Sequence, residues 1–438
     1  MLEYIKNFSE KLLKINNKIQ IISHFDTDGI TSAAILTKTL ERLEKHFSTK
    51  IIKLLSKEEI VGFPEDKTII LLDLGSGSLE LLSKSKNKIF IIDHHEISSL
   101  IPENITILNP HLIKFDNLCS SELTYLVSRE ISSENKDLAY FAILGMIGDV
   151  MEKEINKLRN SIIEESNVII KKGLLIYPST RPLDKSLEFS SRPFIPGITG
   201  NSKGIIELLN EAKIERIGNK YKSLIDLNDK EMKNLITAIM LRISPREISE
   251  YIGNLYLVKL FNKIEDAREV SAIINACSRM GKPEIALLLC LGNNESRKKA
   301  ERIYIKYRQE IISGLRYIEK NNFIYGKDYV IINAKDNIND TLIGTLASIL
   351  SFSPIYKEGT IIITMAYNND KIKVSARIAG RMNNSINLKK LMDSITSLLG
   401  GEESGGHCHA AGCTIKIENE DKFIESIKRH LEFEVIKI

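Results

Sequence analysis

The sequence predicts an α/β protein with two domains of unequal size, on the basis of three observations. Short apolar runs alternate with helical patterns over residues 1–150, a long amphipathic segment occupies 295–320, and β-branched runs return after it. Continuous apolar strands separated by helices are typical of a parallel sheet that is buried on both faces. We therefore expect an N-terminal parallel sheet flanked by helices, a long connecting helix and a smaller C-terminal α/β domain.

Four apolar runs near the N-terminus are the expected strands of the parallel sheet, and each ends in polar residues. They are IQIISHF, TIILLDLG, KIFIID and NITILN. The helical patterns GITSAAILTKTLERL and SLELLSK follow the first two runs, and a mainly helical stretch that ends at Asp149 follows the fourth. Ligands of such sheets bind at the carboxyl ends of the strands, so the polar residues there are expected to form one crevice.

Pro- and Gly-rich loops interrupt the middle of the chain and predict a helical insertion. In the C-terminal domain, DYVIINA, TIIITMAYN and KIKVSARIAG are the expected strands, and the glycine-rich GGEESGGHCHAAGCTI follows them. The expected divisions are a first domain over 1–194 that is completed by 266–294, the insertion over 195–265, the connecting helix over 295–320 and the C-terminal domain over 321–438.

Composition excludes several classes of protein. The chain of 438 residues has a formal net charge of only +4, so no global field indicates a polyanionic partner. Its five cysteines form no CxxC pair, which argues against a disulfide framework or a zinc ribbon and favours a reducing compartment. The N-terminus has the pattern of an amphipathic helix and not of a signal peptide, and no apolar run approaches the roughly 18 residues that span a bilayer. We expect a cytoplasmic protein with no membrane association.

Three polar residues alternate at the end of the first strand, in SHFDTDGITS. Because side chains alternate along a strand, His24, Asp26 and Asp28 are expected to point in one direction. Clustered carboxylates repel one another unless a cation lies between them. An ordinary DTDG turn is the alternative explanation, and this motif alone does not decide between the two.

Further Asp and His residues end the next two strands and the helical stretch. Asp73 ends IILLD, Asp93, His94 and His95 end FIIDHH, and Asp149 lies in GMIGDV. Taken singly, Asp73 is explained as a helix cap, the DHH triplet as chance and Asp149 as a turn residue. Taken together with the first strand, they predict a single metal-binding crevice.

The types of ligand indicate which metal this crevice holds. Mixed carboxylate and imidazole ligation suits Mn²⁺ better than a structural zinc site, and Mg²⁺ is the alternative. The candidate ligands suffice for two ions, with Asp73 between them. Two metal ions about 3.5–4 Å apart are the usual device for in-line hydrolysis at phosphorus.

The ordered motifs HxDxDG, DLG, DHH, GD and GGH…AAG resemble those of the DHH/DHHA1 phosphoesterase family. Within that family the chain is most similar to the RecJ-like, single-strand-specific exonucleases of archaea. TRPLDKSLEFSSRPFIPGITG and EDAREVSAIINACSRMGKPEIALLLCLG resemble segments of the same subgroup, and the resemblance covers nearly the whole chain. It implies an N-terminal DHH domain and a C-terminal DHHA1 domain.

The resemblance also implies a role for each polar residue of the crevice. Asp73 would be shared by two metal ions, and His95 would touch the scissile phosphate while Asp93 supports the two histidines. The remaining metal ligands would be His24 and Asp26 for one ion and Asp28, His94 and Asp149 for the other. Every motif position holds a residue that can do this work, so we predict an active enzyme.

The glycine-rich segment SGGHCHAAG is expected to contact substrate phosphates. Gly405 and Gly406 permit close approach of the backbone, and His407 can donate to a phosphate oxygen. The family pattern has three glycines before this histidine, and the first of them is Ser404 here. A metal cluster of His407 with the neighbouring Cys408 and His409 is disfavoured, because adjacent residues do not easily share one ion.

Three further residues match substrate-binding positions of the family. Arg377 in VSAR matches an arginine of its C-terminal domain. Asn275 and Arg279 match the N-A-x-G-R segment, where Ser278 replaces the glycine. They are expected to contact phosphates along a nucleic-acid strand, and an ordinary helix surface is the alternative.

The resemblance implies a metal-dependent exonuclease that degrades single-stranded DNA or RNA to mononucleotides, in DNA replication and repair or in RNA processing. No aromatic ladder for base stacking is visible, so backbone contacts are expected to dominate. The alternatives are a phosphodiesterase for short oligonucleotides, a pyrophosphatase, which lacks the glycine-rich ending, or a replisome scaffold with a weak site. GINS-like replication proteins and single-strand-binding proteins are the expected partners, and polarity is left open.

Overall fold

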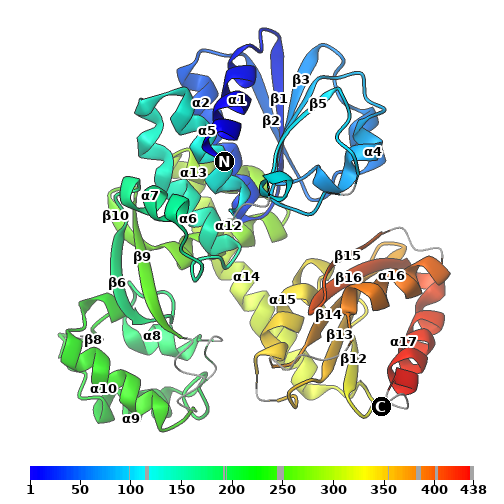
Figure 1. Ribbon diagram of the computed structural model, residues 1–438. Coiled ribbons are helices and arrows are strands. Elements are labelled where there is room, and N and C mark those ends of the chain that lie inside the picture. Colours follow the sequence, from blue (N-terminus) through cyan, green and yellow to red (C-terminus); the bar gives the residue numbers. More distant parts are fainter. Residues whose placement is uncertain are drawn as a thin grey trace. The chain divides into compact units, whose positions relative to one another are not determined.

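The structure is a computed structural model, which describes residues 1–97, 99–113, 118–190, 193, 195–243, 251–353, 355–380, 386–399 and 403–434 (Figure 1). Its chain divides into two compact units. The first comprises Met1–Arg181, Ser223–Asp226 and Ile252–Tyr304, and the second comprises Pro182–Lys222, Leu227–Tyr251 and Ile305–Ile438.

A five-stranded parallel sheet forms the centre of the first unit, in the order β2-β1-β3-β4-β5. The strands are β1 (Lys18–His24), β2 (Phe47–Ile52), β3 (Lys67–Leu72), β4 (Ile89–Ile92) and β5 (Ile105–Leu108). The four predicted strands and their parallel arrangement are confirmed. The edge strand β2 was not predicted, because most of its residues are only half-buried and its FSTKII pattern lacks a continuous apolar run.

Helices cover both faces of this sheet, because successive strand residues point to opposite sides. Ile70 and Leu72 pack with one set of helices, whereas Ile69 and Leu71 pack with the other. The first set is α1 (Leu2–Leu13), α2 (Thr27–Arg42) and α5 (Ser120–Ile131), and the second is α3 (Lys57–Val61) and α4 (Leu79–Leu82). Burial on both faces explains why these strands are apolar throughout.

Further helices and a small antiparallel sheet complete the first unit. Its helices α6, α12 and α13 pack against α2. The additional elements are α6 (Ala139–Gly148), α7 (Lys157–Glu165), β6 (Ile169–Leu174), β9 (Ile252–Leu260), β10 (Lys263–Asp266), α12 (Ala267–Arg279), α13 (Pro283–Cys290) and the short helical turns η1 (Ser76–Ser78), η2 (Pro110–Ile113), η3 (Ser133–Leu138) and η4 (Leu224–Asp226).

The part of the chain predicted as a helical insertion, 195–265, contains both helices and strands. Its helices are α9 (Ser202–Glu211) and α10 (Asp229–Met240), preceded by α8 (Leu183–Glu188), and its short hairpin is β7 (Arg216–Ile217) and β8 (Lys220–Tyr221). Its last part is not helical, because β9 pairs with β6 and β10 in a three-stranded sheet. The β9 sequence IGNLYLVKL is rich in residues that favour strands.

The long helix predicted over 295–320 is α14 (Asn294–Lys320), which begins in the first unit and continues into the second. A six-stranded mixed sheet follows in the order β11-β12-β13-β14-β16-β15. Its strands are β11 (Ile324–Tyr325), β12 (Tyr329–Asn333), β13 (Ile361–Asn368), β14 (Lys371–Ile378), β15 (Glu403–His407) and β16 (Ala410–Lys416).

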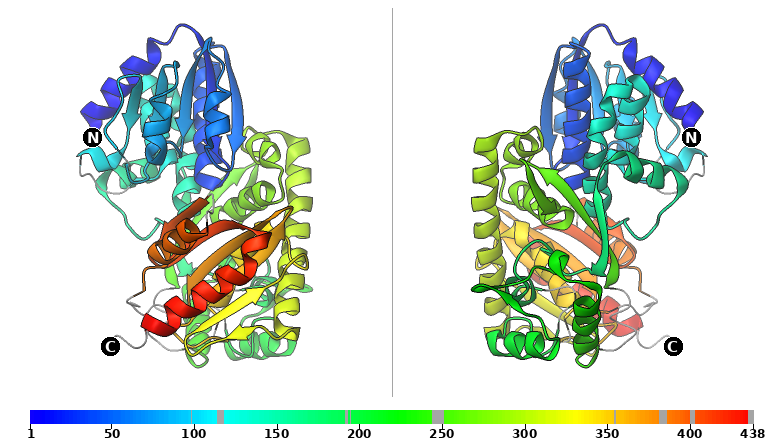
Figure 2. Two further views of the ribbon diagram at one scale, coloured as in Figure 1. Left: turned by 90° about the vertical axis from the view of Figure 1, so that its right-hand side faces the viewer. Right: turned by 90° about the vertical axis from the view of Figure 1, so that its left-hand side faces the viewer.

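Helices flank the C-terminal sheet as well. Figure 2 shows α17 lying across the strands, and its Phe423 and Ile427 belong to the same apolar cluster as the strand residues Ile331 and Ile363. The helices of this domain are α15 (Asp340–Ser351), α16 (Leu388–Leu398) and α17 (Glu420–Glu434), with the short turn η5 (Ile417–Asn419). The predicted fold class is therefore confirmed. In the described part of the chain, no helix combines the length and the apolarity that crossing a bilayer requires.

Candidate metal centre

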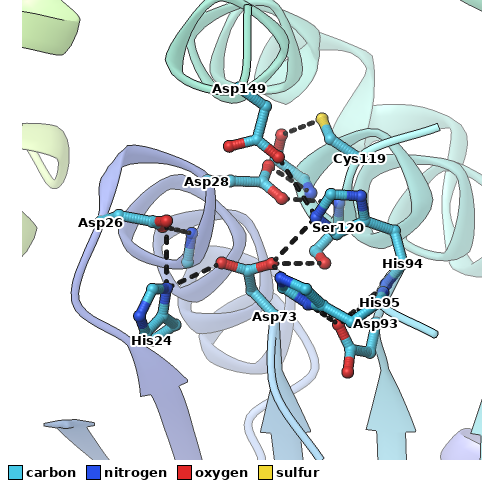
Figure 3. A network of polar contacts seen from close by, with 12 residues as sticks. His24, Asp26, Asp28, Asp73, Asp93, His94, His95, Cys119, Ser120 and Asp149 are labelled. Carbon is cyan, nitrogen blue, oxygen red and sulfur yellow. Dashed lines mark hydrogen bonds and ion pairs between the residues drawn. The ribbon is translucent and has the colours of Figure 1, made fainter. Parts of the chain in front are cut away.

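Side chains from the ends of β1, β3 and β4, from α2 and from the end of α6 meet at the carboxyl ends of the central strands (Figure 3). Asp73 follows β3, in the middle of the sheet, and is 2% exposed. Its φ of +58° lies in the left-handed region, which Asp tolerates better than most residues and which is common at functional sites. Asp73 is the residue around which the other candidate ligands gather.

The two carboxylate oxygens of Asp73 face different partners. Oδ2 lies 3.2 Å from Nδ1 of His24, whereas Oδ1 lies 3.4 Å from Nε2 of His94. Ser120, at the start of α5, donates its hydroxyl to Oδ1 at 3.0 Å. Asp73 thus lies between two groups of side chains, as a shared ligand would.

His24, Asp26 and Asp73 form the first group, whose ligand atoms all lie within 4.8 Å of one another. His24 Nδ1 is 3.0 Å from Asp26 Oδ2. The other Asp26 oxygen accepts a hydrogen bond from the backbone of Gly29 at 3.0 Å, so Asp26 also caps the N-terminus of α2.

Asp28, His94 and Asp149 form the second group within the same 4.8 Å limit. His94 Nε2 lies 3.2 Å from Asp149 Oδ2. Asp28 is fully buried and accepts the backbone N–H groups of Ser120 and Ser121 at 2.7 and 2.9 Å. The N-terminus of α5 therefore holds both oxygens of this carboxylate, where the helix dipole favours negative charge.

His95 forms a third such group with Asp73 and His94, and Asp93 lies beside it. Asp93 Oδ1 lies 2.7 Å from Nδ1 of His95 and accepts the backbone N–H groups of His94 and His95. Ser76 donates its backbone N–H to the other Asp93 oxygen at 2.9 Å. Burial alone would raise the pKa of Asp93, but the hydrogen bonds from His95 and Ser76 and the charge of His95 hold it below its ordinary value. The side chain of His95 is 51% exposed, and its Nδ1 also lies 3.9 Å from Asp73.

The electrostatics of this cluster fit a bound cation. Burial, followed by the charges of Asp26 and Asp28, raises the pKa of Asp73 to about 6. Burial and the charge of Asp28 raise the pKa of Asp149 to about 8. Burial lowers the pKa of His94, but its hydrogen bonds with Asp149 and Asp73 outweigh this and raise it to about 12.

These directions describe carboxylates that are too close together to ionise comfortably without positive charge between them. Carboxylate oxygens and imidazole nitrogens are donors that suit Mn²⁺ and related divalent ions. The residues present therefore fit the binding of divalent metal ions around Asp73.

Several residues that support this centre were not predicted. Glu122 and Arg159 form a fully buried, two-pronged ion pair, with distances of 2.6 and 2.7 Å. Glu122 also accepts the backbone N–H of Cys119 at 2.9 Å and so fixes the first turn of α5. The N-cap of α5 is Cys119 and not the Ser or Thr of the usual capping signal, and nothing in the sequence links Glu122 to Arg159, 37 positions away.

Asn109, at the end of β5, is a second unpredicted supporting residue. It is fully buried, and its amide donates to the hydroxyl of Ser76 at 2.9 Å and to the backbone carbonyl of His95 at 2.8 Å. Its carbonyl oxygen accepts the backbone N–H of His111 at 2.9 Å. Asn109 thereby ties the segment that carries His95 to the neighbouring strand.

Asn275 lies beside the metal centre, although its sequence position is distant. Its Oδ1 accepts the backbone N–H of Thr27, between Asp26 and Asp28, at 3.2 Å. Arg279 lies four positions further along, in the last turn of α12.

The predicted C-terminal residues gather at one end of the six-stranded sheet, within the second unit. His407 and Arg377 lie opposite the same residue, Ala410. Gly406 has a φ of +122°, and a side chain there would clash with the carbonyl of Ala410, so glycine is required. Gly405 lies one position earlier on β15. Arg377 donates to the hydroxyl of Ser348 at 3.0 Å, which holds its guanidinium against α15.

Family comparisons match three parts of the chain. The N-terminal domain of the DHH family matches residues 18–146, the DHH-CID domain 176–253 and the DHHA1 domain 326–432. An uncharacterized protein of Methanocaldococcus jannaschii is 30% identical over 442 residues, which is 97% of this chain and 95% of that protein.

Solved structures share the fold at low identity. RecJ of Thermus thermophilus, in complex with Mn²⁺, superposes with a TM-score of 0.61 at 17% identity and covers 98% of this chain; this chain covers only 54% of that one. An exonuclease RecJ bound to manganese superposes with a TM-score of 0.61 at 16% identity, and the match covers 98% of this chain and 94% of that one. CDC45 of Entamoeba histolytica superposes with a TM-score of 0.64 at 13% identity, and the match covers 98% of this chain and 97% of that one. The chain therefore belongs to the DHH family of phosphoesterases, with a C-terminal DHHA1 domain and a RecJ-like fold.

Proposed function

We propose that this protein is a metal-dependent exonuclease that hydrolyses phosphodiester bonds of single-stranded DNA or RNA and releases mononucleotides. The observation that carries the proposal is the position of Asp73, whose two oxygens face His24 and His94 in two separate groups of candidate ligands. A carboxylate shared by two ions would hold them close together, as hydrolysis at phosphorus by two metal ions needs.

His24, Asp26 and Asp73 would hold one Mn²⁺ or Mg²⁺ ion. Asp28, His94 and Asp149 would hold the other together with Asp73. When bound, such ions activate water and neutralise charge on the phosphoryl group. The protein supplies a fixed set of ligands: the N-terminus of α5 fixes Asp28, and the cap of α2 fixes Asp26.

His95 is the proposed contact to the scissile phosphate. The hydrogen bond with Asp93 at Nδ1 raises the pKa of His95 and so favours the protonated imidazole. In that form Nε2 also carries a proton and is the ring nitrogen left to donate to a phosphate oxygen. Half-exposure of the side chain is consistent with access for a substrate. Asp93 would orient the imidazole without touching substrate itself.

The remaining proposed contacts bind phosphates of the same strand. Asn275 and Arg279 would act beside the metal centre, and the C-terminal domain would add phosphate contacts from Arg377, His407 and the backbone at Gly405 and Gly406. Backbone N–H groups and arginine are common ligands of phosphate oxygens. Such contacts do not read base identity, so weak sequence preference is expected.

Activity on labelled polymers tests the proposal. Single-stranded DNA and RNA, each labelled at one end or the other, are incubated with the protein and Mn²⁺. Early release of labelled mononucleotide from one end is expected and also identifies the polarity. Turnover of dinucleotides without cleavage of either polymer would instead favour a phosphodiesterase for short oligonucleotides.

Two substitutions test the assignment of the metal ligands. Asp73→Ala and His94→Ala should abolish Mn²⁺-dependent cleavage, because each removes a ligand near the shared carboxylate, while circular dichroism shows an intact fold. Asp137→Ala and His46→Ala alter exposed residues of the same types and should leave cleavage unchanged. Full activity of either ligand variant would show that the assignment is wrong.

A role as a scaffold in DNA replication or repair, with GINS-like or single-strand-binding proteins as partners in the cytoplasm, is the second candidate. The shared fold with CDC45 of Entamoeba histolytica favours considering it. Metal content separates the two roles: the purified enzyme should take up close to two Mn²⁺ per chain, whereas a scaffold needs none. Absence of both metal uptake and cleavage would favour the scaffold.

A further inference from the structure

A cavity of about 340 Å³ lies at the edge of the C-terminal sheet formed by β11 and β12. Its lining is aromatic and basic. The lining residues are Tyr325, Gly326, Lys327, Tyr329, Val330, Ile355, Tyr356, Lys357 and Thr360. Because β11 and β15 are the two opposite edges of this sheet, the cavity is separate from the proposed phosphate contacts at Gly405, Gly406 and His407.

The wall of this cavity is held in place by buried contacts. Tyr329 is only 5% exposed, and its hydroxyl donates to Glu432 of α17 at 3.0 Å. Residue 326 is a glycine, and a side chain there would come within 2.1 Å of the Tyr329 ring. The ring therefore packs directly on the backbone of the β11–β12 turn, which shapes the cavity before any ligand arrives.

Two tyrosines give the cavity an accessible aromatic surface. Tyr325 is 62% exposed and Tyr356 is half-buried, and the side chains of both line the cavity. Exposed Ile355, at 70%, adjoins Tyr356 in the chain. An accessible tyrosine pair at the rim of a cavity is suited to stacking with a flat, apolar ring system.

Two exposed lysines, Lys327 and Lys357, supply positive charge at the same cavity. No carboxylate is among the described residues that line it. A ligand that uses both features has a flat aromatic part and an anionic part, which is the chemistry of a nucleotide. An acidic peptide would satisfy the lysines but would leave the tyrosine faces unused.

We propose that this cavity binds one nucleotide, with the base on Tyr325 and Tyr356 and the phosphate at Lys327 and Lys357. The volume of the cavity is at the lower end of the range for small-molecule sites, which suits a single nucleotide. We take this nucleotide to be one unit of a single strand, and that part of the inference rests on the proposed function. The free mononucleotide is the other source, and the test separates the two.

Binding of a fluorescent 15-nucleotide oligo(dT) or oligo(U) to the full-length protein, in EDTA so that nothing is cleaved, is measured by anisotropy. Tyr325→Ala combined with Tyr356→Ala should weaken binding by about tenfold, because stacking of one base is lost. Tyr325→Phe keeps the aromatic face and should bind within about twofold of wild type. Lys327→Ala combined with Lys357→Ala should weaken binding and reduce the slope of log affinity against log salt by about 0.7 per phosphate contact.

Matched controls identify the cause of any loss. Lys422→Ala alters an exposed lysine of α17 and should change neither the affinity nor the salt slope. Thermal unfolding checks that the tyrosine variants fold. Competition with UMP assigns the source: displacement of the labelled strand at micromolar UMP, from wild type but not from the tyrosine variant, indicates a free nucleotide.

Wild-type affinity and salt slope in both the tyrosine and the lysine variants would overturn the inference. Loss of polyglutamate binding in these variants, with oligonucleotide binding intact, would overturn it in favour of an acidic protein partner. The two proposals fail separately. If the wild-type protein cleaves strands and the variants bind them normally, only the proposed nucleotide site is contradicted. If the protein cleaves no strand but needs the two tyrosines to bind one, only the proposed exonuclease activity is contradicted.

Discussion

At the scale of single residues, the DHH triplet divides into three roles. His94 faces Asp73 and Asp149 and is placed to ligate, whereas His95 is half-exposed beside them. Asp93 is fully buried and accepts three N–H groups of the two histidines and one of Ser76. These hydrogen bonds support the proposal that Asp93 positions the two histidines and does not itself bind a metal ion.

Asp93→Asn tests this role. The amide can still accept from His95, but its NH₂ group then meets the backbone N–H of Ser76, and two donors repel each other. Activity should fall by about 10- to 100-fold, the usual effect of changing a residue that orients a metal site. Steady-state cleavage and Mn²⁺ titration measure it, with Asp137→Asn as the exposed control. Unchanged turnover would show that the orientation of His95 does not matter.

At the scale of secondary structure, the N-terminus of α5 and the helix α6 together form the wall behind Asp28. Two backbone N–H groups of α5 hold the carboxylate, and Gly145 of α6 lies directly behind it. The buried pair of Glu122 with Arg159 in turn anchors the first turn of α5 to α7. The positions of these helices therefore determine the position of Asp28, one of the candidate metal ligands.

Gly145→Ala changes that wall without replacing any candidate ligand. The added Cβ would lie 1.9 Å from the hydroxyl of Ser121 and 2.5 Å from Asp28 Oδ1, so Asp28 must move. Mn²⁺ affinity should fall by about 10-fold or more, even though alanine favours a helix by about 1 kcal/mol over glycine. Isothermal titration with Mn²⁺ measures this. Gly77→Ala, whose Cβ meets nothing within 4 Å, is the matched control and should bind normally.

Glu122→Gln tests the anchoring ion pair. Both side chains are fully buried, so the substitution leaves the charge of Arg159 in the interior without its partner. The free energy of unfolding should fall by about 3–5 kcal/mol in urea denaturation. Asp137→Asn removes the partner of Arg42 at an exposed pair and should cost at most about 1 kcal/mol. A loss of similar size in both variants would show that the buried pair does not anchor α5.

At the scale of the whole molecule, the sequence predicts what depends on local pattern. The four apolar strands and the residues at their carboxyl ends follow from periodicity, and the parallel arrangement follows from the helices between them. The strand β2 was not predicted, because Ser48, Thr49 and Lys50 break the apolar run. The supporting roles of Arg159 and Asn109 were not predicted, because the residues they contact come from distant segments of the sequence.

The aromatic cavity could not be predicted from the sequence for the same reason. Tyr325 and Tyr356 are separated by a strand and a helix in the sequence, so their pairing is a property of the folded sheet edge. No ladder of aromatic residues is visible without the fold. What periodicity can predict is therefore the scaffold and the ends of its strands, whereas side chains that meet across elements require the tertiary structure.

Because every candidate ligand belongs to the first of the two compact units, metal binding should stabilise that unit alone. Mn²⁺ at about 100 times its Kd adds about 2.7 kcal/mol to the free energy of unfolding. For a unit of this size, such a gain raises Tm by roughly 5–10 °C. In scanning calorimetry of the whole chain, Mn²⁺ should move the transition of the first unit upward, and EDTA should reverse the shift. Asp73→Ala should abolish it, whereas Arg377→Ala in the C-terminal sheet should keep it. An equal shift in wild type and Asp73→Ala would mean that the ions bind elsewhere, because a site centred on Asp73 cannot survive the loss of its shared carboxylate.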